Sequence, residues 1–451
     1  MSQLDGARIL MYSHDTFGLG HLRRCRTIAH SLVENYSGLS VLIISGSAIA
    51  GAFDFRARVD FVKIPSVIKL RNGEYTSLDK HIDLSETIRM RESIIRHTAE
   101  SFRPDIFIVD KEPMGLQGEI TDTLAYLKSI GTTLVLGLRD VMDSPHLLAA
   151  EWKRKALVPK IDKTYDHIWI YGPENFYNPM IGIDITPAMR KRMSFVGFLK
   201  RQALHEDLSA HKQEGDYILV TTGGGGDGVA LIQDVLGAYE GDSTLQHKAF
   251  IVLGPYMPGK ERGELLARGE ALANVEVIDF DSRMEELISS ARAVVSMGGY
   301  NTFCEILSFD KPALIVPRTV PREEQLLRTQ RASQLGMVDM LLPEDASDPM
   351  KMSAALKALP NTPKPSQRAT KFELNGLENV SELVSKLYSE RVKKNLDVEQ
   401  RPYNQFDWQS GISSRNGSRF GALYRSAQGR CRAERLSEII GDLHCSRNTG
   451  T

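Results

Sequence analysis

The feature that most constrains the fold is an alternation of short apolar runs with amphipathic stretches along the first part of the chain. Each run carries apolar residues at consecutive positions rather than at every second one, which is typical of strands covered on both faces. The helical patterns between them, notably residues 83–102 and 117–130, predict a parallel, doubly wound sheet. We expect its strands at residues 7–13, 41–45, 59–65, 106–110, 132–138, 167–172 and 194–197. The polar interval 69–81 predicts a long loop.

The same alternation restarts in the second part of the chain. The apolar pattern lapses over residues 199–215, which we interpret as a linker. Beyond it, we expect strands at residues 217–222, 248–254, 275–280, 292–297, 313–317 and 338–342, with helices at 229–239, 260–272, 284–291, 300–307 and 323–335. The sequence therefore predicts an α/β protein with two similar doubly wound domains, over residues 1–198 and 216–375.

The C-terminal part of the chain has a different composition. Residues 376–395 carry apolar side chains at helical spacing, and the predicted helix either packs on the second domain or crosses back to the first. Residues 396–451 contain no lysine and are rich in Arg, Ser, Gly and Asn. We expect this tail to be mostly disordered, with a short helix near residues 431–443.

The overall composition argues against several classes of protein. A net charge of −1 does not predict nucleic-acid binding. The four cysteines, Cys25, Cys304, Cys431 and Cys445, lie far apart, so neither a disulfide framework nor a zinc site is expected and a cytoplasmic location is favoured. We recognise no signal peptide, and no apolar run approaches the roughly 18 residues that cross a bilayer. Peripheral contact with the inner face of a membrane is compatible with the sequence.

A glycine loop with a histidine follows the first expected strand. Gly18 and Gly20 permit a sharp turn and a close approach of the backbone to a ligand. The helix after them directs free N–H groups toward that ligand, and His21 at its start suits acid–base chemistry. The alternative is a tight turn with a solvated histidine.

Two further glycine loops follow expected strands of the second domain. In TTGGGGDG, residues 221–228, consecutive glycines expose backbone N–H groups that suit a diphosphate. The run also matches GxGxxG, but the next strand ends without the acidic residue that a nicotinamide site needs, and no Walker A sequence occurs. The third loop lies in SMGGYNTFCE, residues 296–305. The candidate binding residues of both loops are Gly223, Gly224, Gly225, Gly298, Gly299, Asn301 and Thr302.

Polar residues near other strand ends complete the candidate site. Glu305 can accept hydrogen bonds from a ribose diol, and Gln325 can reach the same ligand. The acidic residues at 279 and 281 could hold Mg²⁺ or Mn²⁺, but we favour a solvated turn and expect neither a metal nor a cofactor. Polar strand-end residues of the first domain are expected to line the opposite wall: His14, Asp15, Asp110, Glu112, Arg139 and Asp140.

Two stretches resemble known families. GLGHLRRCRTIA, residues 18–29, resembles the opening of the sugar-nucleotide hydrolase of pseudaminic acid synthesis and the first glycine-rich loop of the MurG-type glycosyltransferases. SMGGYNTFCEIL, residues 296–307, together with residues 311–336, is similar to the C-terminal domain of glycosyltransferase family 28. The resemblance implies the GT-B fold, in which two Rossmann-like domains flank a cleft, the second holding the nucleotide-sugar donor and the first the acceptor.

The resemblance also implies roles for individual residues and chemistry without a catalytic metal. By position, these roles are ribose binding by Glu305, donor-sugar contact by Gln325, nucleobase contact by Phe280 and Met284, diphosphate contact by Gly223–Gly226, and proton abstraction by His21.

These observations predict a glycosyltransferase that uses a nucleotide-sugar donor, expected to be UDP-linked, and inverts the anomeric carbon. His21, or a carboxylate such as Asp110, would take the proton from the acceptor hydroxyl. The sequence leaves the acceptor open among a sugar, a lipid and another small molecule. Two alternatives also stay open: a nucleotide-sugar hydrolase, in which water replaces the acceptor, and a non-catalytic nucleotide-sugar-binding protein.

Overall fold

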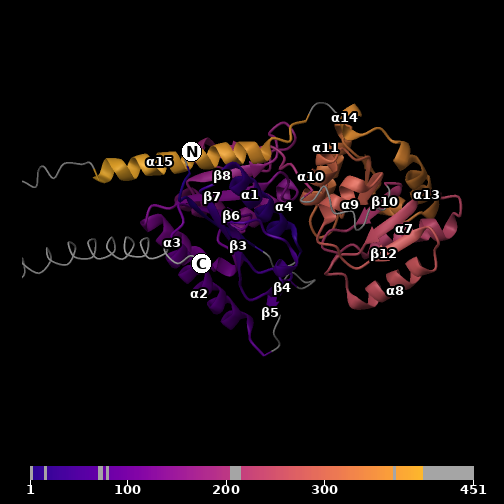
Figure 1. Cartoon of the computed structure of the whole chain (residues 1–451), viewed down its shortest axis with the longest axis horizontal. Coiled ribbons are helices and arrows are strands. Elements are labelled where there is room, and N and C mark those ends of the chain that lie inside the picture. Colours follow the sequence, from indigo (N-terminus) through magenta and orange to yellow (C-terminus); the bar gives the residue numbers. More distant parts are fainter. Residues whose placement is uncertain are drawn as a thin grey trace, which may run out of the picture. The chain divides into compact units, whose positions relative to one another are not determined.

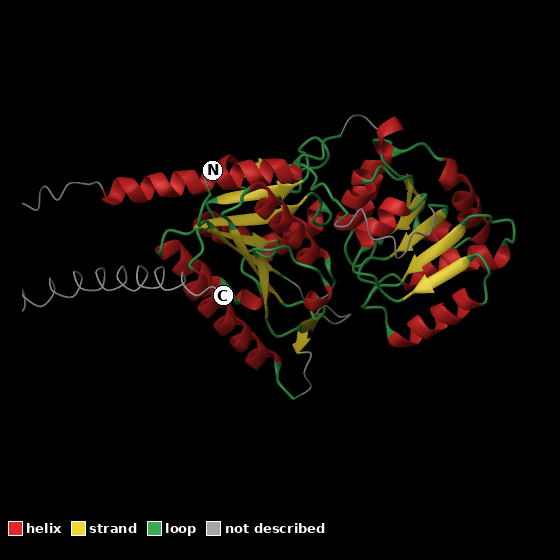
Figure 2. Ribbon diagram, in the orientation of Figure 1, coloured by secondary structure: helices red, strands yellow, loops and turns green. Residues whose placement is uncertain are grey.

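The computed structural model describes residues 4–14, 18–69, 75–77, 81–203, 215–368 and 372–399. Within these residues the chain forms two parallel sheets with helices on both faces of each (Figure 1, Figure 2). The predictions for residues 400–451, and for most of the expected linker, lie outside the described residues.

The first sheet confirms the strands expected in the first part of the chain. It is 7-stranded and parallel, in the order β3-β2-β1-β6-β7-β8-β9. The strands are β1 (Arg8–Ser13), β2 (Ser40–Ser45), β3 (Val59–Lys63), β6 (Ile106–Asp110), β7 (Thr133–Arg139), β8 (His167–Tyr171) and β9 (Met193–Phe195). Every side chain of β6 is buried, because helices cover both faces of the sheet.

The second sheet confirms the second series in the same way. It is 6-stranded and parallel, in the order β12-β11-β10-β13-β14-β15. The strands are β10 (Tyr217–Thr221), β11 (Lys248–Val252), β12 (Val275–Ile278), β13 (Ala293–Ser296), β14 (Ala313–Ile315) and β15 (Asp339–Met340).

Helices connect the strands of both sheets. Those of the first domain are α1 (Gly20–Asn35), α2 (Leu84–Phe102), α3 (Thr121–Ser129), α4 (Pro145–Arg154), α5 (Leu157–Thr164) and α6 (Pro187–Lys191), with 3₁₀ turns at Ala50–Ala52 and Leu116–Gly118. Those that follow are α7 (Val229–Gly241), α8 (Gly259–Glu270), α9 (Met284–Ser290), α10 (Tyr300–Ser308), α11 (Glu324–Gln334), α12 (Pro343–Ala346), α13 (Pro349–Ala358), α14 (Pro365–Arg368) and α15 (Gly376–Glu399), with a 3₁₀ turn at Leu359–Asn361.

Two features of the first domain differ from expectation. The interval 69–81 is not simply a loop, because β4 (Val67–Lys69) and β5 (Tyr75–Ser77) form an antiparallel pair within its described residues. The helices α4 and α5 were not expected.

The C-terminal helix α15 crosses back to the first domain, which settles the two alternatives for it. Its Ser381 accepts a hydrogen bond of 2.9 Å from Asn35 Nδ2 on α1, and its Arg391 Nε lies 3.1 Å from Asp105 Oδ1. Figure 1 shows α15 running beside β7 and β8. The helix therefore ties the end of the second domain to the first.

The strand order places a topological switch point in each sheet. The order reverses between β1 and β6 in the first sheet and between β10 and β13 in the second. Ligands of open α/β sheets bind in the crevice outside such points, at the carboxyl ends of the strands. The three glycine loops follow β1, β10 and β13, so all of them lie at a switch point.

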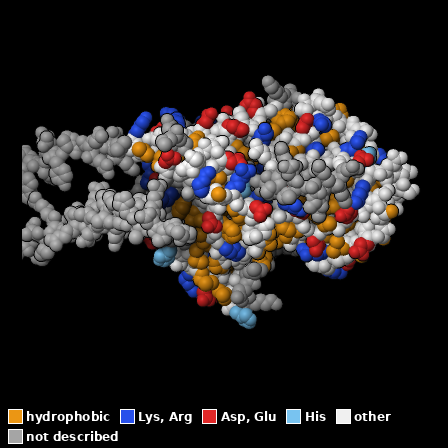
Figure 3. Space-filling model, viewed as in Figure 1, with side chains coloured by type: hydrophobic (Ala, Val, Ile, Leu, Met, Phe, Trp, Pro, Cys, Tyr) orange, Lys and Arg blue, Asp and Glu red, His pale blue; other side chains and the backbone are white. Residues whose placement is uncertain are grey.

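The two domains share an apolar contact close to these loops. Phe176 and Phe198 of the first domain pack against Phe303 of α10, with their ring centroids 5.8 and 5.4 Å from that of Phe303. On the surface, acidic and basic side chains are interspersed over the face in Figure 3. Among the described helices, none combines the length and the apolar character that crossing a membrane requires.

Candidate active site

The two switch points contribute to one cavity of about 220 Å³. Its walls come from the loop before α1, the glycine loop after β10 and the first turns of α10 and α11. The predicted binding residues that line it are Gly18, Gly20, Gly223, Gly224, Gly299, Asn301, Thr302 and Gln325. Four segments that lie far apart in the sequence therefore meet at one site.

Glycine is favoured where the loops of the two domains touch. A Cβ on Gly224 would lie 3.3 Å from the Cα of Gly18, so the two loops pass with backbone against backbone. Gly225 does not line the cavity. Its φ is +87°, and a Cβ there would lie 2.5 Å from the carbonyl oxygen of Leu253. Glycine at this position therefore allows the loop to take its conformation.

The N-terminus of α10 points its free backbone donors at the cavity wall. Gly299 is the N-cap residue and supplies no side-chain cap, and Gly299, Tyr300, Asn301 and Thr302 all line the cavity. Free N–H groups and the positive end of the helix dipole favour an anion at such a place. Gly298 lies beneath this turn, where a Cβ would meet Ile315 at 2.8 Å.

Four arginines line the cavity: Arg23, Arg24, Arg139 and Arg318. Each of them is paired with at least one carboxylate. Arg318 contacts both Asp227 and Glu324, and Glu324 also accepts from Arg139 across the domain boundary. An anionic ligand could exchange places with these carboxylates because guanidinium groups bind phosphate as readily.

His21 and Asp110, chosen from the sequence as separate candidates, contact each other. The distance between His21 Nδ1 and Asp110 Oδ2 is 2.5 Å. Asp110 ends β6 and is 1% exposed, whereas the His21 side chain is 16% exposed and follows Gly20 of the cavity wall. Arg24 binds the same carboxylate through two nitrogens, with Nε 2.8 Å from Oδ1.

This arrangement sets the protonation states of the pair. Burial alone would raise the pKa of Asp110, but the Arg24 guanidinium and the His21 contact hold it well below its usual range. Burial lowers the pKa of His21, and the nearby charge of Arg24 lowers it further, against the opposing effect of Asp110. At neutral pH the pair is therefore a carboxylate beside a neutral imidazole, in which only the imidazole is a useful base.

A second histidine lies beside the first. The ring centroids of His14 and His21 are 5.8 Å apart, and burial lowers the pKa of His14 to about 3. The hydroxyl of Tyr12 lies 3.3 Å from His14 Nδ1, and Glu119 accepts from the same hydroxyl while it also binds Arg91. Asp15, the other candidate on this loop, lies outside the described residues.

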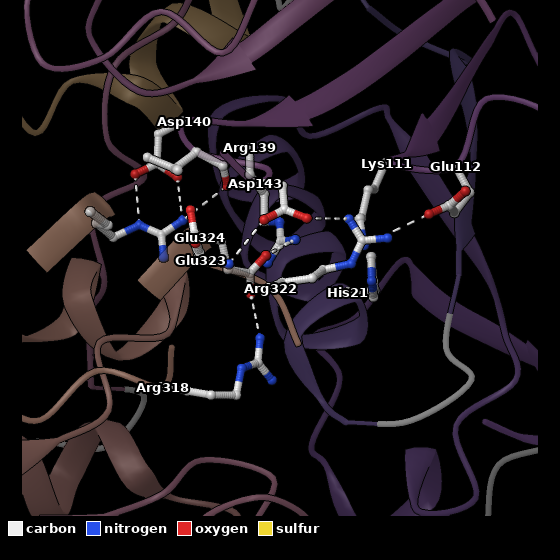
Figure 4. A network of polar contacts seen from close by, with 12 residues as sticks. His21, Lys111, Glu112, Arg139, Asp140, Asp143, Arg318, Arg322, Glu323 and Glu324 are labelled. Carbon is white, nitrogen blue, oxygen red and sulfur yellow. Dashed lines mark hydrogen bonds and ion pairs between the residues drawn. The ribbon is translucent and has the colours of Figure 1, made fainter. Parts of the chain in front are cut away.

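The start of α11 and the segment just before it are held to the first domain by a network of ion pairs (Figure 4). Arg328 binds Asp140 through two nitrogens, at 2.8 and 2.6 Å, and both side chains are fully buried. Arg322 contacts Asp143 at 3.3 Å. Lys111 and Glu112 lie near the His21 end of this network, and burial lowers the pKa of Lys111 to about 8.

His21 and Asp110 are not among the residues that line the cavity, and besides Gly225 and Gly298 three further predicted binding residues do not line it either. Glu305 is 1% exposed and contacts Arg23, and its Oε2 has no hydrogen-bond partner among the described residues. Phe280 packs edge to face on Phe53 of the first domain, with centroids 6.2 Å apart, and Met284 is buried in the core. The first domain thus occupies the space beside Phe280, where the resemblance implies the nucleobase.

The acidic residues at 279 and 281 have arginine and backbone partners. Asp279 lies 3.5 Å from Arg262 Nε, and Asp281 accepts a hydrogen bond of 2.7 Å from the backbone N–H of Arg283. Over the part of the chain that the structure describes, no group of three His, Cys, Asp or Glu side chains is placed to hold a metal ion.

Sequence reasoning missed several residues of the cavity wall. Arg24, Tyr256, Arg318 and Glu324 line the cavity and were not selected. Arg24 carried a usable signal, because it lies three positions after His21 and so shares its helix face. Arg318 and Glu324 gave a weaker signal, since they flank a proline-containing turn at the end of a strand.

Comparison with known proteins identifies the second domain and the fold. The model of the glycosyltransferase family 28 C-terminal domain matches residues 218–384. An uncharacterized glycosyltransferase of Methanosarcina acetivorans is 22% identical over 311 residues, which cover 66% of this chain and 77% of that protein.

Solved structures with the same architecture cover most of the chain. TcCGT1 in complex with UDP has a TM-score of 0.57 at 13% identity, and the glycosyltransferase of kitacinnamycin has 0.53 at 15%. They cover 86% and 88% of this chain, and 100% and 99% of their own. UDP-GlcNAc 2-epimerase from Neisseria meningitidis has a TM-score of 0.53 at 14% identity and covers 85% of this chain and 100% of its own. Residues 218–384 thus match the family 28 C-terminal domain of glycosyltransferases, and the chain shares the two-domain GT-B fold of the solved glycosyltransferases, which supports its assignment as a transferase.

Proposed function

We propose that the protein transfers a sugar from a UDP-linked donor to a hydroxyl of an acceptor, with inversion at the anomeric carbon and with His21 as the general base. The observation that carries this proposal is the His21–Asp110 contact of 2.5 Å beside an arginine-lined cavity to which both domains contribute. A cytoplasmic location, expected from the cysteine usage, is part of the same proposal.

The charge of the cavity supports a diphosphate ligand. Arg139 and Arg318, the N-terminus of α10 and the N–H groups of the glycine loop after β10 surround the space in which two phosphates would carry negative charge. Among the structural relatives, TcCGT1 was solved with UDP. These positive groups would stabilise the departing UDP, so we expect turnover in the presence of EDTA.

Glu305 is proposed to bind the ribose of the donor. Its buried Oε2 lacks a hydrogen-bond partner among the described residues, and burial raises the pKa of this carboxyl group. A ribose hydroxyl would satisfy that oxygen. Arg23 contacts the other oxygen, Oε1, so a ribose hydroxyl could bind Oε2 without displacing it.

His21 is placed for one proton transfer. Because Asp110 engages Nδ1, the other ring nitrogen, Nε2, is free to accept the proton of an acceptor hydroxyl. The hydroxyl oxygen then forms a bond to the anomeric carbon while the bond from that carbon to the diphosphate oxygen breaks. Asp110 would orient the imidazole and stabilise its positive charge, and it would not take the proton itself.

The hydrolase alternative uses the same residues with water as acceptor, and the resemblance of residues 18–29 favours it. Incubation with UDP-sugars alone separates the two. Prompt release of UDP without an acceptor would support hydrolysis, whereas release that depends on an added acceptor would support transfer. Binding of UDP-sugars without release under any acceptor would support the binding protein.

The test of the proposed function is His21→Ala, assayed for UDP release and for UDP binding by thermal shift. We expect kcat to fall by about 10²–10⁴-fold, the usual contribution of a general base, while UDP still raises the melting temperature. Glu305→Gln is the matched control, since it should weaken UDP binding and leave the His21–Asp110 contact in place. Unchanged turnover in His21→Ala would refute the assignment of the base.

A further inference from the structure

Arg24 is a buried cation that belongs to no predicted role. It is 1% exposed, and its Cζ lies 5.7 Å from the ring centroid of Tyr171 on β8 and 5.5 Å from that of Tyr300 on α10. Aromatic faces on two sides favour a guanidinium between them. Because Tyr171 and Tyr300 belong to different domains, both domains fix the position of Arg24.

The guanidinium is aimed at Asp110. Arg24 Nε donates to Oδ1 at 2.8 Å, and Nη2 donates to Oδ2, the oxygen that also contacts His21. A bidentate pair of this kind fixes the plane of the carboxylate. The plane of the carboxylate in turn fixes the direction from which the His21 ring approaches.

The same contacts decide which nitrogen of His21 carries the hydrogen. Nδ1 lies 2.5 Å from Asp110 Oδ2 and 3.3 Å from Arg24 Nη2. Arginine can only donate and a carboxylate can only accept, so the shorter contact with Asp110 requires the hydrogen on Nδ1. Nε2 is then the unprotonated nitrogen.

We propose that Arg24 is a positioning residue that keeps His21 and Asp110 as a neutral imidazole and a carboxylate, and so keeps the base ready to accept a proton. This inference rests on the proposed function of His21. An unpaired carboxylate at 2.5 Å would strongly favour the imidazolium form, which cannot act as a base. Arg24 compensates that charge and leaves the hydrogen bond that orients the ring.

Other charged groups also face His21 and act on its pKa, so the effect of Arg24 must be separated from theirs. Lys111 and Glu112, just after β6, carry opposite charges 3.7 Å apart, and His14 stands beside the ring and is neutral at physiological pH. Lys111 acts on His21 in the same direction as Arg24 but more weakly. Lys111→Met is therefore a matched control that removes one positive charge without touching Asp110.

The test is a pH titration of the full chain labelled with ¹³C- and ¹⁵N-histidine, followed by NMR, in which the His21 signal is assigned by its loss in His21→Gln. In the unsubstituted protein at pH 7, we expect a neutral ring with the hydrogen on Nδ1. In Arg24→Gln, we expect the pKa of His21 to rise by about one unit or more, a tenfold change in the protonation equilibrium. In Lys111→Met, we expect a clearly smaller rise.

Three results would overturn the inference: a protonated or Nε2–H ring in the unsubstituted protein at pH 7, an unshifted pKa in a folded Arg24→Gln, or an equal shift in Lys111→Met. The first does not depend on how any Arg24 variant folds. The titration needs no substrate, so it is independent of whether UDP-sugars are turned over. Where turnover is measurable, the acid limb of kcat/KM should move to higher pH in Arg24→Gln, whereas a merely structural role would lower activity equally at all pH values.

Discussion

Gly225 holds the loop after β10 in a conformation that other residues rarely adopt. Its φ is +87°, and an added Cβ would lie 2.5 Å from the carbonyl oxygen of Leu253 and 3.0 Å from that of Gly254. Both atoms are backbone and cannot rotate away. Gly225→Ala should therefore displace the loop, with a strain of about 1–3 kcal/mol.

We expect Gly225→Ala to weaken UDP binding about tenfold or more, measured by isothermal titration calorimetry, because the displaced loop carries Gly223 and Gly224 of the cavity wall. The control is Gly237→Ala in the middle of α7, where an added Cβ meets nothing within 4 Å. That change should leave UDP affinity unaltered and stabilise the helix by up to about 1 kcal/mol. Equal UDP affinity in both variants would contradict the role of this loop.

At the first glycine loop, the residue types could be selected from the sequence, but the contacts between distant residues could not. The types and spacing of Gly18, Gly20 and His21 were enough to select the first loop. The contact of His21 with Asp110 could not be derived, because the two lie 89 positions apart and their side chains meet only through the pairing of β1 with β6. The sequence therefore offered them as rival bases, whereas the structure makes them partners.

At the scale of elements, the strands could be predicted because burial on both faces leaves continuous apolar runs. β10 and β13 are buried at every position, and each was expected within one or two residues of its observed bounds. Helix α15 could not be placed, although its existence was predicted. Its apolar stripe fits either domain, and contacts that only the structure shows, such as that of Ser381 with Asn35, decide between them.

Truncation of a buried side chain on α15 tests its docking on the first domain. Leu387 is 4% exposed, so Leu387→Ala should lower the free energy of unfolding by about 2–5 kcal/mol, measured by urea denaturation. Hydrogen exchange should accelerate in strands of the first sheet more than in those of the second. Lys386→Ala, at the exposed neighbouring position, should change neither. Faster exchange confined to β10–β15 would show that the helix stabilises the other domain.

At the scale of the whole molecule, ion pairs between distant residues connect the domains around the cavity. Arg139 and Glu324 are 185 positions apart, and Arg328 and Asp140 are 188 apart. No local pattern in the sequence predicts such pairs, because each charged residue taken alone is typical of a solvated surface. The fold was therefore predictable from the sequence, whereas the closed contact between the domains was not.

The Arg328–Asp140 pair allows the domain contact to be tested directly. Both side chains are fully buried, and Arg328 also donates to the carbonyl oxygen of Gly298, beneath the start of α10. Arg328→Met leaves the Asp140 carboxylate buried without its cation, which should cost about 3–5 kcal/mol. We expect a lower Tm and, because the first domain loses an anchor on α11, a larger radius of gyration by small-angle X-ray scattering.

The double variant Arg328→Met/Asp140→Leu removes both charges and should recover more than half of the lost stability, because burying two apolar groups carries no unpaired charge. A double variant no more stable than Arg328→Met would show that the guanidinium acts through Gly298 and the α10 turn rather than through Asp140. UDP provides the final comparison. If the pair holds the cavity in its binding arrangement, UDP should raise the Tm of the double variant less than that of the unsubstituted protein, even where their stabilities without ligand are similar.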